Sequence, residues 1–480
     1  MTATHHPSTE QAENQEAAFE DFCSRYPAYR RTHSLDDLRQ REYQRLDAQG
    51  HAYLDYTGGG LYGDHQLRDH MALLQQGVFG NPHSSNPTSR AATELDEHAR
   101  HYVLKYFNAS PDEYEVVFTQ NASGALKIVG ESYPFGRNDR YALTFDNHNS
   151  VNGIREFARA RGAQVTYIPV TPPDLRVNEA DLLAVLDHPT PGGNNLFAYP
   201  AQSNFSGVQH PLEWIEMAHA RGWDVLLDAA AFAPTNPLDL SQWKPEYIDL
   251  SFYKMFGYPT GVGCLIAKKS ALAKLQRPWF AGGTIEIASV QGGGHILHEG
   301  AAAFEDGTIN YLILPAVEIG LKHLEAVGVE LIHDRVVCLA GWLIERLLSL
   351  QHANGKPVIR LYGPADTQMR GGTVTINFYD PAGRLFDWRK VEAAANLEQI
   401  SLRTGCFCNP GAGEIINGLT AADMEIHFRS QNRMTFEEFI EVMDGKANGA
   451  VRISLGIVSN FSDVWRFWRF AQGFVDKVVE

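Results

Sequence analysis

The sequence predicts an α/β protein in which a mostly parallel sheet flanked by helices is followed by a smaller α+β C-terminal domain. From about residue 50, short apolar strands alternate with amphipathic helices, as in EVVFT followed by ASGALKIVGESY. Near residue 300 the alternation ends, and long helical segments precede separated strands such as GGTVTINFY and GAVRISLG. Alternation of strand and helix predicts βαβ units with helices on both faces of the sheet. A length of 480 residues suits two or three domains.

The chain divides into four predicted segments. Residues 1–17 are polar and lack the basic and apolar regions of a secretory signal, so we expect a disordered tail. Residues 18–50 are expected to form an arm that packs on the C-terminal domain. Residues 51–305 are predicted to form the large domain. Residues 306–480 are predicted to form the small domain, which carries two cysteines one residue apart.

Composition argues against several classes of partner. The net charge is −16, from 41 basic and 57 acidic residues, which disfavours nucleic acid or an anionic membrane as the main partner. No apolar stretch approaches the roughly 18 residues of a membrane span. The five cysteines are few and odd in number, which argues against a disulfide framework. We therefore expect a cytoplasmic protein with reduced thiols.

The first candidate site lies where a predicted strand turns into a helix. The stretch FTQNASGALK places the small residues Ala122, Ser123 and Gly124 at this turn. Free backbone N–H groups and the helix dipole make such a turn suitable for a phosphate group. An ordinary turn between strand and helix is the alternative, and taken alone the stretch does not decide between them.

Two further candidates follow on the same predicted sheet. Asp228 ends the apolar strand DVLLD, where a carboxylate needs a cationic or hydrogen-bonding partner, such as a protonated heterocyclic nitrogen. Lys254 lies in the apolar stretch SFYKMFGYP, and such surroundings lower the pKa of a lysine and favour the neutral amine that a Schiff base requires. The alternatives are an aspartate that caps a helix and a lysine that extends to the surface.

Three chemical roles compete for Cys406 and Cys408 in the stretch RTGCFCNPG. A zinc site requires four ligands, and no second Cys/His cluster accompanies the pair. A disulfide between residues this close would be strained. A nucleophile needs thiolate character and access, which a glycine-flanked loop beside Arg403 could provide.

Two weaker patterns carry no assignment. The stretch GGGLYG, residues 58–63, matches the dinucleotide pattern G-x-G-x-x-G without a clear βαβ unit around it, so we expect a flexible turn at the site entrance. His295, His298 and Glu299 form no complete ligand set, so no metal is expected.

Taken together, these features resemble a known family. A phosphate-binding turn, then Asp228, then Lys254 some 26 residues later, is the order found in pyridoxal-phosphate enzymes of the aspartate-aminotransferase fold. The chain resembles their class V branch, which contains the cysteine desulfurases, and in particular the N-terminal desulfurase domain of molybdenum cofactor sulfurases. The blocks that carry the resemblance, over roughly residues 50 to 465, are NPHSSNPTSR, DNHNSVNGIRE, SFYKMFGYPTGVGCLI, FAGGTIEIAS, SLRTGCFCNPGAGE and GAVRISLG.

The resemblance implies fold type I of the pyridoxal-phosphate-dependent transferases, with the cofactor in the large domain. Lys254 would form the Schiff base with pyridoxal 5'-phosphate, and Asp228 would pair with the pyridinium nitrogen. His148 resembles the imidazole that stacks on the cofactor ring and moves protons. Asn204 resembles the residue that hydrogen-bonds the ring hydroxyl. The residues implied to hold the phosphate are Ala122, Ser123, Ser251 and Tyr253.

A partner subunit is implied as well. Thr284 resembles a residue that reaches the partner's phosphate, which implies a homodimer with shared active sites. One departure is Ala231, where many desulfurases carry a Gln that touches the ring hydroxyl; the sulfurase branch tolerates a small residue there. The chain ends at Glu480 and is expected to lack the sulfurases' C-terminal cofactor-binding domain.

The resemblance also implies the chemistry. Arg403 and Arg452 resemble the arginines near the substrate carboxylate, although a structural ion pair is the alternative for Arg452. Cys408 matches the nucleophile position and Cys406 a position that often holds His, while Gly413 stands where sulfurases often have a third cysteine. The implied activity converts L-cysteine to L-alanine and leaves a persulfide on Cys408 for an acceptor protein or cofactor.

Two other functions stay open at this point. A class V lyase or aminotransferase-like enzyme could act on another amino acid, as in secondary metabolism. A non-catalytic scaffold could keep the fold only to bind a partner, but it would have no need for Lys254, Asp228, His148, Arg452 and Cys408 together.

Overall fold

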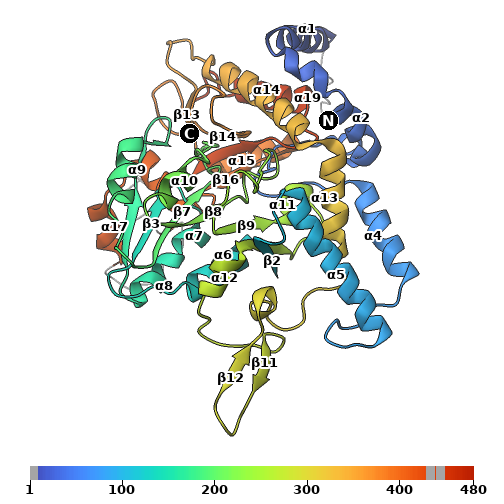
Figure 1. The fold of residues 1–480 in the computed structure, drawn as a ribbon. Coiled ribbons are helices and arrows are strands. Elements are labelled where there is room, and N and C mark those ends of the chain that lie inside the picture. Colours follow the sequence, from blue (N-terminus) through green and yellow to red (C-terminus); the bar gives the residue numbers. More distant parts are fainter. Residues whose placement is uncertain (1–8, 429–437, 439–448, 480) are drawn as a thin grey trace.

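A seven-stranded sheet forms the centre of the molecule (Figure 1). The computed structural model describes residues 9–428, 438 and 449–479. In spatial order the strands are β2 (Tyr114–Thr119), β10 (Gly263–Lys268), β9 (Tyr247–Ser251), β8 (Asp224–Asp228), β7 (Asn195–Pro200), β3 (Arg140–Thr144) and β4 (Gln164–Ile168). Strand β10 runs antiparallel to both neighbours, and the other pairs of this sheet are parallel. The predicted mostly parallel sheet is confirmed.

Helices cover both faces of this sheet. Strand side chains alternate between two hydrophobic clusters, as Leu226 and Leu227 do on β8. Burial on both faces explains why the strands have nearly continuous apolar sequences. The helices of this part are α4 (Asp64–Gln76), α5 (Pro87–Tyr106), α6 (Ala122–Ser132), α7 (Asn149–Asn152), α8 (Ile154–Ala160), α9 (Glu179–Leu186), α10 (Trp214–His219), α11 (Phe252–Phe256) and α12 (Lys269–Lys274).

The C-terminal part is built on an antiparallel sheet. Its strands, in spatial order, are β13 (Ile359–Tyr362), β14 (Thr373–Phe378), β17 (Ala450–Ser454) and β16 (Arg403–Gly405). Its helices are α13 (Pro315–Val327), α14 (Val329–Leu348), α15 (Trp388–Leu397), α16 (Pro410–Asn417), α17 (Ala421–Phe428) and α19 (Phe461–Gln472). Helix α13 packs on α5 and α4, so it joins this part to the large sheet.

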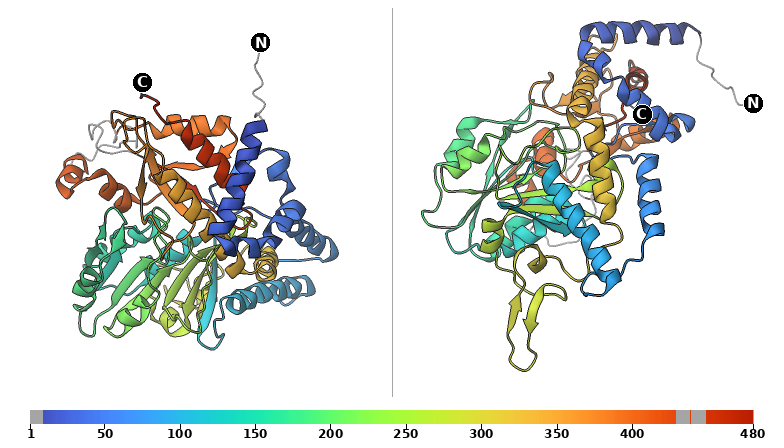
Figure 2. Two further views of the ribbon diagram at one scale, coloured as in Figure 1. Left: turned by 90° about the horizontal axis from the view of Figure 1, so that it is seen from above. Right: turned by 45° about the vertical axis from the view of Figure 1, so that its right-hand side comes forward.

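The N-terminal segment contacts the C-terminal part (Figure 2). It comprises α1 (Thr9–Arg25), η1 (Pro27–Thr32), α2 (Ser34–Glu42), α3 (Gln44–Ala48) and β1 (Ala52–Tyr53). Strand β1 pairs in parallel with β15 (Ile400–Ser401), although sequence analysis assigned it to the large domain. Helix α1 differs from the expected tail over residues 1–17, since it begins at Thr9; Ala, Glu and Gln favour helix there. Residues 1–8 lie outside the described part.

Two smaller sheets complete the fold. The hairpin of β11 (Ile285–Ala288) and β12 (His295–Leu297) projects from the body, beside the short helix η2 (Gly300–Ala303) (Figure 1). Strands β5 (Val170–Thr171) and β6 (Arg176–Val177) form the other. In the described ranges, no helix is long and apolar enough to span a membrane.

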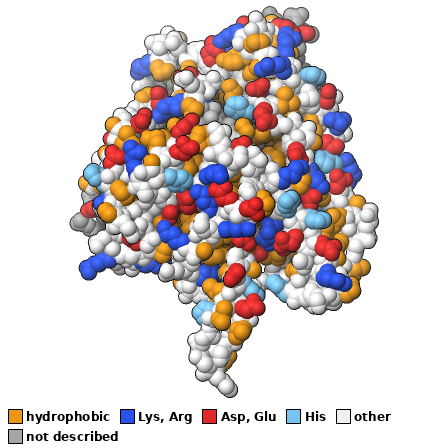
Figure 3. All heavy atoms as spheres, viewed as in Figure 1, with side chains coloured by type: hydrophobic (Ala, Val, Ile, Leu, Met, Phe, Trp, Pro, Cys, Tyr) orange, Lys and Arg blue, Asp and Glu red, His pale blue; other side chains and the backbone are white. Residues whose placement is uncertain are grey.

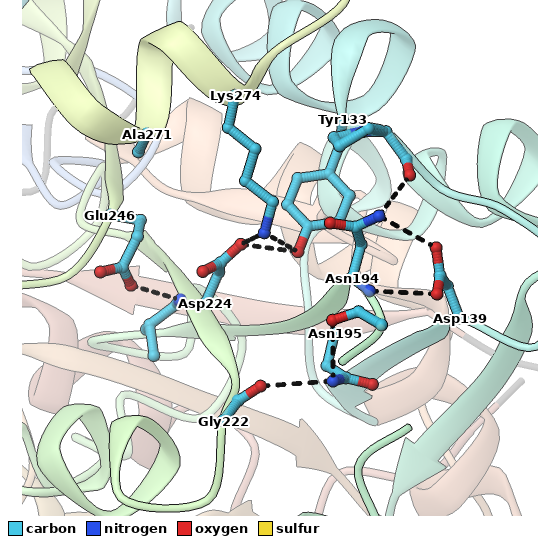
Figure 4. A network of polar contacts seen from close by, with 12 residues as sticks. Tyr133, Asp139, Asn194, Asn195, Gly222, Asp224, Glu246, Ala271 and Lys274 are labelled. Carbon is cyan, nitrogen blue, oxygen red and sulfur yellow. Dashed lines mark hydrogen bonds and ion pairs between the residues drawn. The ribbon is translucent and has the colours of Figure 1, made fainter. Parts of the chain in front are cut away.

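A polar network lies at the amino-terminal end of strand β8 in the central sheet (Figure 4). The Tyr133 hydroxyl donates to Asp224 at 2.7 Å, and Lys274 forms an ion pair with the same carboxylate. Asp224 begins strand β8 and Asp228 ends it. The side chains of Tyr133, Asp224 and Lys274 bond to one another at the amino-terminal end of β8. In such sheets ligands bind at the opposite side, at the carboxyl ends of the parallel strands.

Candidate active site

The carboxyl ends of the parallel strands border one cavity. Eight of the nine predicted cofactor residues line it, although they come from five separate strand ends. They are Ala122, Ser123, His148, Asn204, Asp228, Ser251, Tyr253 and Lys254. The ninth, Thr284, does not line it.

The start of helix α6 offers a seat for a phosphate group. The hydroxyl Oγ of Ser251 accepts a hydrogen bond from the Ala122 N–H at 2.9 Å, so its own proton stays available for another acceptor. Ser123 Oγ lies 2.6 Å from Ser150 Oγ. These hydroxyls, with the positive end of the α6 dipole, favour an anion at this point.

The amine of Lys254, a half-buried residue, lies within the electrostatic reach of the Asp228 carboxylate. Asp228 ends β8 and accepts a hydrogen bond from the Ala230 N–H at 3.0 Å, while Lys254 follows β9 on α11. Burial lowers the pKa of Lys254, and the negative charge of Asp228 opposes this shift. A lowered pKa favours the neutral amine, which is the nucleophilic form.

A second carboxyl group lies directly beside Asp228. Asp249 pairs with Asp228 across strands β9 and β8, is fully buried, and has no hydrogen-bond partner for either carboxyl oxygen in the described structure. Burial raises the pKa of Asp249 well above its ordinary range, and the charge of Asp228 raises it further. Asp249 is therefore the protonated member of the pair.

The ring of His148 has a defined tautomer. Its Nδ1 accepts a hydrogen bond from the Ser150 N–H at 3.2 Å, so the neutral ring carries its proton on Nε2. Burial lowers the pKa of His148 and keeps the ring neutral near pH 7. Nε2–H is thus the group available to a ligand in the cavity.

The cysteine loop, residues 406–409, lies beside His148. The Cys408 side chain is exposed and that of Cys406 is half-buried. Phe407 and Cys408 have positive φ angles of 55° and 53°. The carbonyl of Cys408 accepts a hydrogen bond at 2.7 Å from the N–H of Asn149, the residue after His148. A thiolate at Cys408 would raise the pKa of Lys254, which brings the two groups into one electrostatic site.

The two predicted substrate arginines share one carboxylate, that of Asp55. Arg403 donates to Asp55 Oδ2 through Nη2 at 2.6 Å and Nε at 3.0 Å, and Arg452 donates to Oδ1 at 3.1 Å. Arg452 also donates to the Asn204 carbonyl at 3.0 Å, while its buried Nε has no partner in the described structure. The ion-pair alternative is therefore present, and the binding of a substrate carboxylate stays a prediction.

Comparison with known proteins identifies the family of this chain. The family model Aminotransferase class-V matches residues 52–467. The chain belongs to the class V aminotransferase family.

The curated relatives of this class V chain include molybdenum cofactor sulfurases. That of Oryza sativa subsp. japonica is 37% identical over 479 residues, covering 91% of this chain and 57% of the relative. That of Homo sapiens is 36% identical over 458 residues, covering 91% and 51%. The chain thus spans between about half and three fifths of the length of the curated relatives it matches.

Solved structures confirm the predicted fold type I. A cysteine desulfurase from Thermococcus onnurineus NA1 superposes with a TM-score of 0.74 at 22% identity, covering 92% of this chain and 98% of that one. A cysteine desulfurase from Escherichia coli gives a TM-score of 0.72 at 19% identity, covering 92% and 98%. At this level of identity the likeness concerns the fold.

Membership of the class V family indicates pyridoxal phosphate as the cofactor. The residues present fit it. The start of α6 and Ser251 suit the phosphate, the charged member of the buried Asp228–Asp249 pair suits a pyridinium nitrogen, and Lys254 supplies a desolvated amine.

Some predicted residues of this class V chain lie elsewhere. Thr284 is buried, and its hydroxyl donates to the Ala281 carbonyl at 2.8 Å within its own turn, so its contact with a partner subunit stays a prediction. His298 pairs with Glu286 at 2.6 Å, and His295 packs on Phe280. Across the described ranges no group of three or more His, Cys, Asp or Glu could hold a metal. The glycine turn of residues 58–63 lies against α11, where the Gly60 N–H donates to the Tyr253 carbonyl at 2.9 Å.

Four residues that line the cavity or support its surroundings were not predicted from the sequence: Gln202 and Asp249 line it, and Asp55 and Asn409 lie outside it. Asp55 follows a short strand and precedes the glycine turn, a position that could have drawn attention to it. Gln202 lines the cavity beside Ala231 and donates to its carbonyl at 3.0 Å. Asn409 precedes Pro410, and Asn followed by Pro is a signature of a helix start.

Proposed function

We propose that this class V enzyme is a cysteine desulfurase that loads sulfur onto Cys408. L-cysteine and the Cys408 thiol would give L-alanine and a Cys408 persulfide: the carbon–sulfur bond of the substrate breaks, and a sulfur–sulfur bond forms. The observation that carries the proposal is the exposed Cys408, whose backbone carbonyl accepts a hydrogen bond from the N–H of Asn149 beside His148. The molybdenum cofactor sulfurases among the relatives favour sulfur transfer over other class V chemistry.

Each side chain has a defined task in this proposal. The bound cofactor supplies an electron sink for the carbon atoms of the amino acid. Lys254, with its lowered pKa, accepts and returns the Cα proton. His148 offers Nε2–H toward the cavity. Arg452 and Arg403 hold the substrate carboxylate on the side away from Asp55.

The decisive experiment compares the two cysteines of the loop. Cys408→Ala is expected to lower the rate of persulfide and alanine formation from L-cysteine by at least about 100-fold, because the only exposed thiol of the site is gone. Cys406→Ala is the matched control and should keep more than about half of the rate. Persulfide is measured by mass spectrometry and alanine by chromatography.

Three outcomes decide between the candidate functions. Full-rate persulfide formation by Cys408→Ala would overturn the assignment of the nucleophile. A wild-type protein that binds the cofactor but ignores L-cysteine, and turns over another amino acid, would favour the lyase alternative. A protein that binds no cofactor would favour the scaffold.

The assembly is proposed to be a homodimer that passes sulfur to an acceptor protein or cofactor in the cytoplasm. The β11–β12 hairpin supports a protein contact, because it projects from the body and carries exposed hydrophobic side chains (Figure 3). They are Ile287, Val290 and Ile296.

A further inference from the structure

The side chain of Asn409 lies between the cysteine loop and the cofactor cavity. It is fully buried, with no exposed surface. Its Nδ2 donates to the carbonyl of Asp146 at 2.6 Å and to Oδ1 of Asn204 at 2.9 Å. Asp146 is two residues before His148, and Asn204 lines the cavity. One amide therefore contacts both sides of the predicted cofactor site.

Asn204 and Asn149 in turn donate hydrogen bonds to backbone carbonyls of the cysteine loop. Asn204 Nδ2 donates to the carbonyl of Phe407 at 2.8 Å, and the Asn149 N–H donates to the carbonyl of Cys408 at 2.7 Å. Three consecutive residues of the loop are thus each hydrogen-bonded to Asn204 or to the segment around His148. Phe407 and Cys408 lie in the left-handed region, which L-residues other than Asn and Asp rarely adopt, so the loop needs such bonds to keep this shape.

Asn409 has a second, separable task. Its Oδ1 accepts a hydrogen bond from the Ala412 N–H at 3.2 Å and so caps helix α16. The first turn of that helix lies close to the residue that follows strand β3, since a Cβ on Gly411 would lie 1.9 Å from the Phe145 carbonyl oxygen. The acceptor oxygen of Asn409 starts the helix, and its donor nitrogen fastens the loop. A serine can keep the first function and not the second.

We propose that Asn409 is a positioning residue that couples the Cys408 thiol to the cofactor site. It fixes the loop against Asn204 and the segment that carries His148, so the thiol is presented to the substrate sulfur in one place. This inference rests on the proposed desulfurase function. Loss of the two donor bonds is expected to free the loop that carries the sulfur-accepting thiol, while the start of α6 and Asp228 keep their own hydrogen bonds.

The test uses the holoenzyme of Asn409→Ser, with Asn178→Ser as the matched control. Asn178 also caps a helix, α9, accepting from the Ala180 N–H at 2.9 Å, and does not line the cavity. Two reactions are compared: exchange of the L-alanine Cα proton in D₂O, which requires Lys254 but no thiol, and formation of persulfide from L-cysteine. The rate of Cys408 alkylation by iodoacetamide, followed by peptide mass spectrometry, reports the freedom of the loop.

Asn409→Ser should retain alanine exchange and the KM for cysteine within about twofold. Its kcat for persulfide formation should fall by at least about 30-fold, and Cys408 alkylation should accelerate by at least about fivefold. The control should match wild type in all of these. Wild-type persulfide rates in Asn409→Ser, an equal fall in both reactions, or unchanged alkylation would each overturn the proposal. If wild type exchanges alanine but makes no persulfide, the desulfurase function fails, and alkylation alone still decides whether Asn409 holds the loop.

Discussion

Asp249 shows how the surroundings of a carboxyl group set its pKa, because it lies beside a second carboxyl group, that of Asp228. They face each other on neighbouring strands, yet only Asp249 is wholly buried without a hydrogen-bond partner in the described structure. Two carboxylates this close cannot both ionise at low cost. A proton on Asp249 therefore removes the repulsion between the two carboxyl groups.

This proton makes stability depend on pH. The pKa of Asp249 is raised in the folded protein, so the folded state binds a proton that the unfolded state releases above about pH 4. Stability is then lost as pH rises from that value toward the folded pKa. Asp249→Asn removes this loss, so its stability relative to wild type should be greater at pH 8 than at pH 5.

Urea denaturation of the cofactor-free protein at the two pH values measures the effect. Asp112→Asn, at an exposed position, is the matched control and should show no such difference. A constant difference between Asp249→Asn and wild type at both pH values would mean that Asp249 is ionised in the folded state.

Residue types indicated Asp228 and Lys254 as candidate site residues, and the family resemblance added His148, but neither indicated the residues that support them. Asp228 ends a strand, Lys254 and His148 follow strands, and parallel strands bring their carboxyl ends to one side of the sheet. Asp249 and Asn409 depend on which strands become neighbours and on how a loop folds back, information that pairs of residues distant in sequence supply. Arg452 shows the same limit, since its bond to Asp55 joins residues 397 positions apart.

At the scale of elements, strand β10 packs against helix α6, whose start is the predicted phosphate site. Gly263 on this strand lies against Asn121, the residue before α6. A Cβ there would lie 2.4 Å from the Leu250 carbonyl oxygen and 2.6 Å from the Asn121 backbone. Asn121 caps α6 and thereby fixes the first N–H groups of the helix.

Gly263→Ala is therefore expected to displace the start of α6. The affinity for pyridoxal phosphate should fall at least about tenfold, and the free energy of unfolding by about 1–3 kcal/mol, as for an overpacked core. Gly136→Ala is the matched control, because its Cβ would meet only Asp139 at an ordinary 3.4 Å. Titration of the cofactor by absorbance and chemical denaturation measure the two effects. An unchanged affinity for pyridoxal phosphate in Gly263→Ala would show that the start of α6 can shift without weakening phosphate binding.

Two features of the strands could not be predicted from the sequence, the direction of β10 and the pairing of β1. Alternating strands and helices predicted the parallel core, but the antiparallel direction of β10 could not be inferred from its apolar sequence, since an apolar strand suits either direction. The two-residue strand β1 was too short to show any period, and only its pairing with β15 assigns it to the C-terminal part.

At the scale of the whole molecule, the β11–β12 hairpin should govern assembly. A combined Ile287→Ser, Val290→Ser and Ile296→Ser variant removes its exposed apolar surface without touching the core. We expect wild type to be a dimer and the variant a monomer by light scattering, with a dissociation constant raised at least about 100-fold. Leu397→Ser, at an exposed position on α15, should stay dimeric. A variant that remains dimeric would exclude the hairpin as the contact.

The N-terminal arm and the last helix form one packed unit. The guanidinium of Arg335 on α14 is buried and donates to the Thr32 carbonyl at 2.7 Å and to Asp36 at 2.7 Å. The ring of Phe22 stacks on that of Phe461, with centroids 5.0 Å apart. The N-terminal helices are thus held by residues of both α14 and α19.

This arrangement imposes an order of events during synthesis. The Tyr29 hydroxyl accepts a hydrogen bond from the N–H of Phe461, which is 432 residues later in the chain. At ribosomal speed that separation corresponds to roughly 20–90 s, during which the large sheet has already emerged and can fold as a unit. During that time Phe22 and Tyr29 of the arm lack their contacts with Phe461. The nascent chain should therefore present a chaperone-binding segment near its N-terminus until the last helix leaves the ribosome.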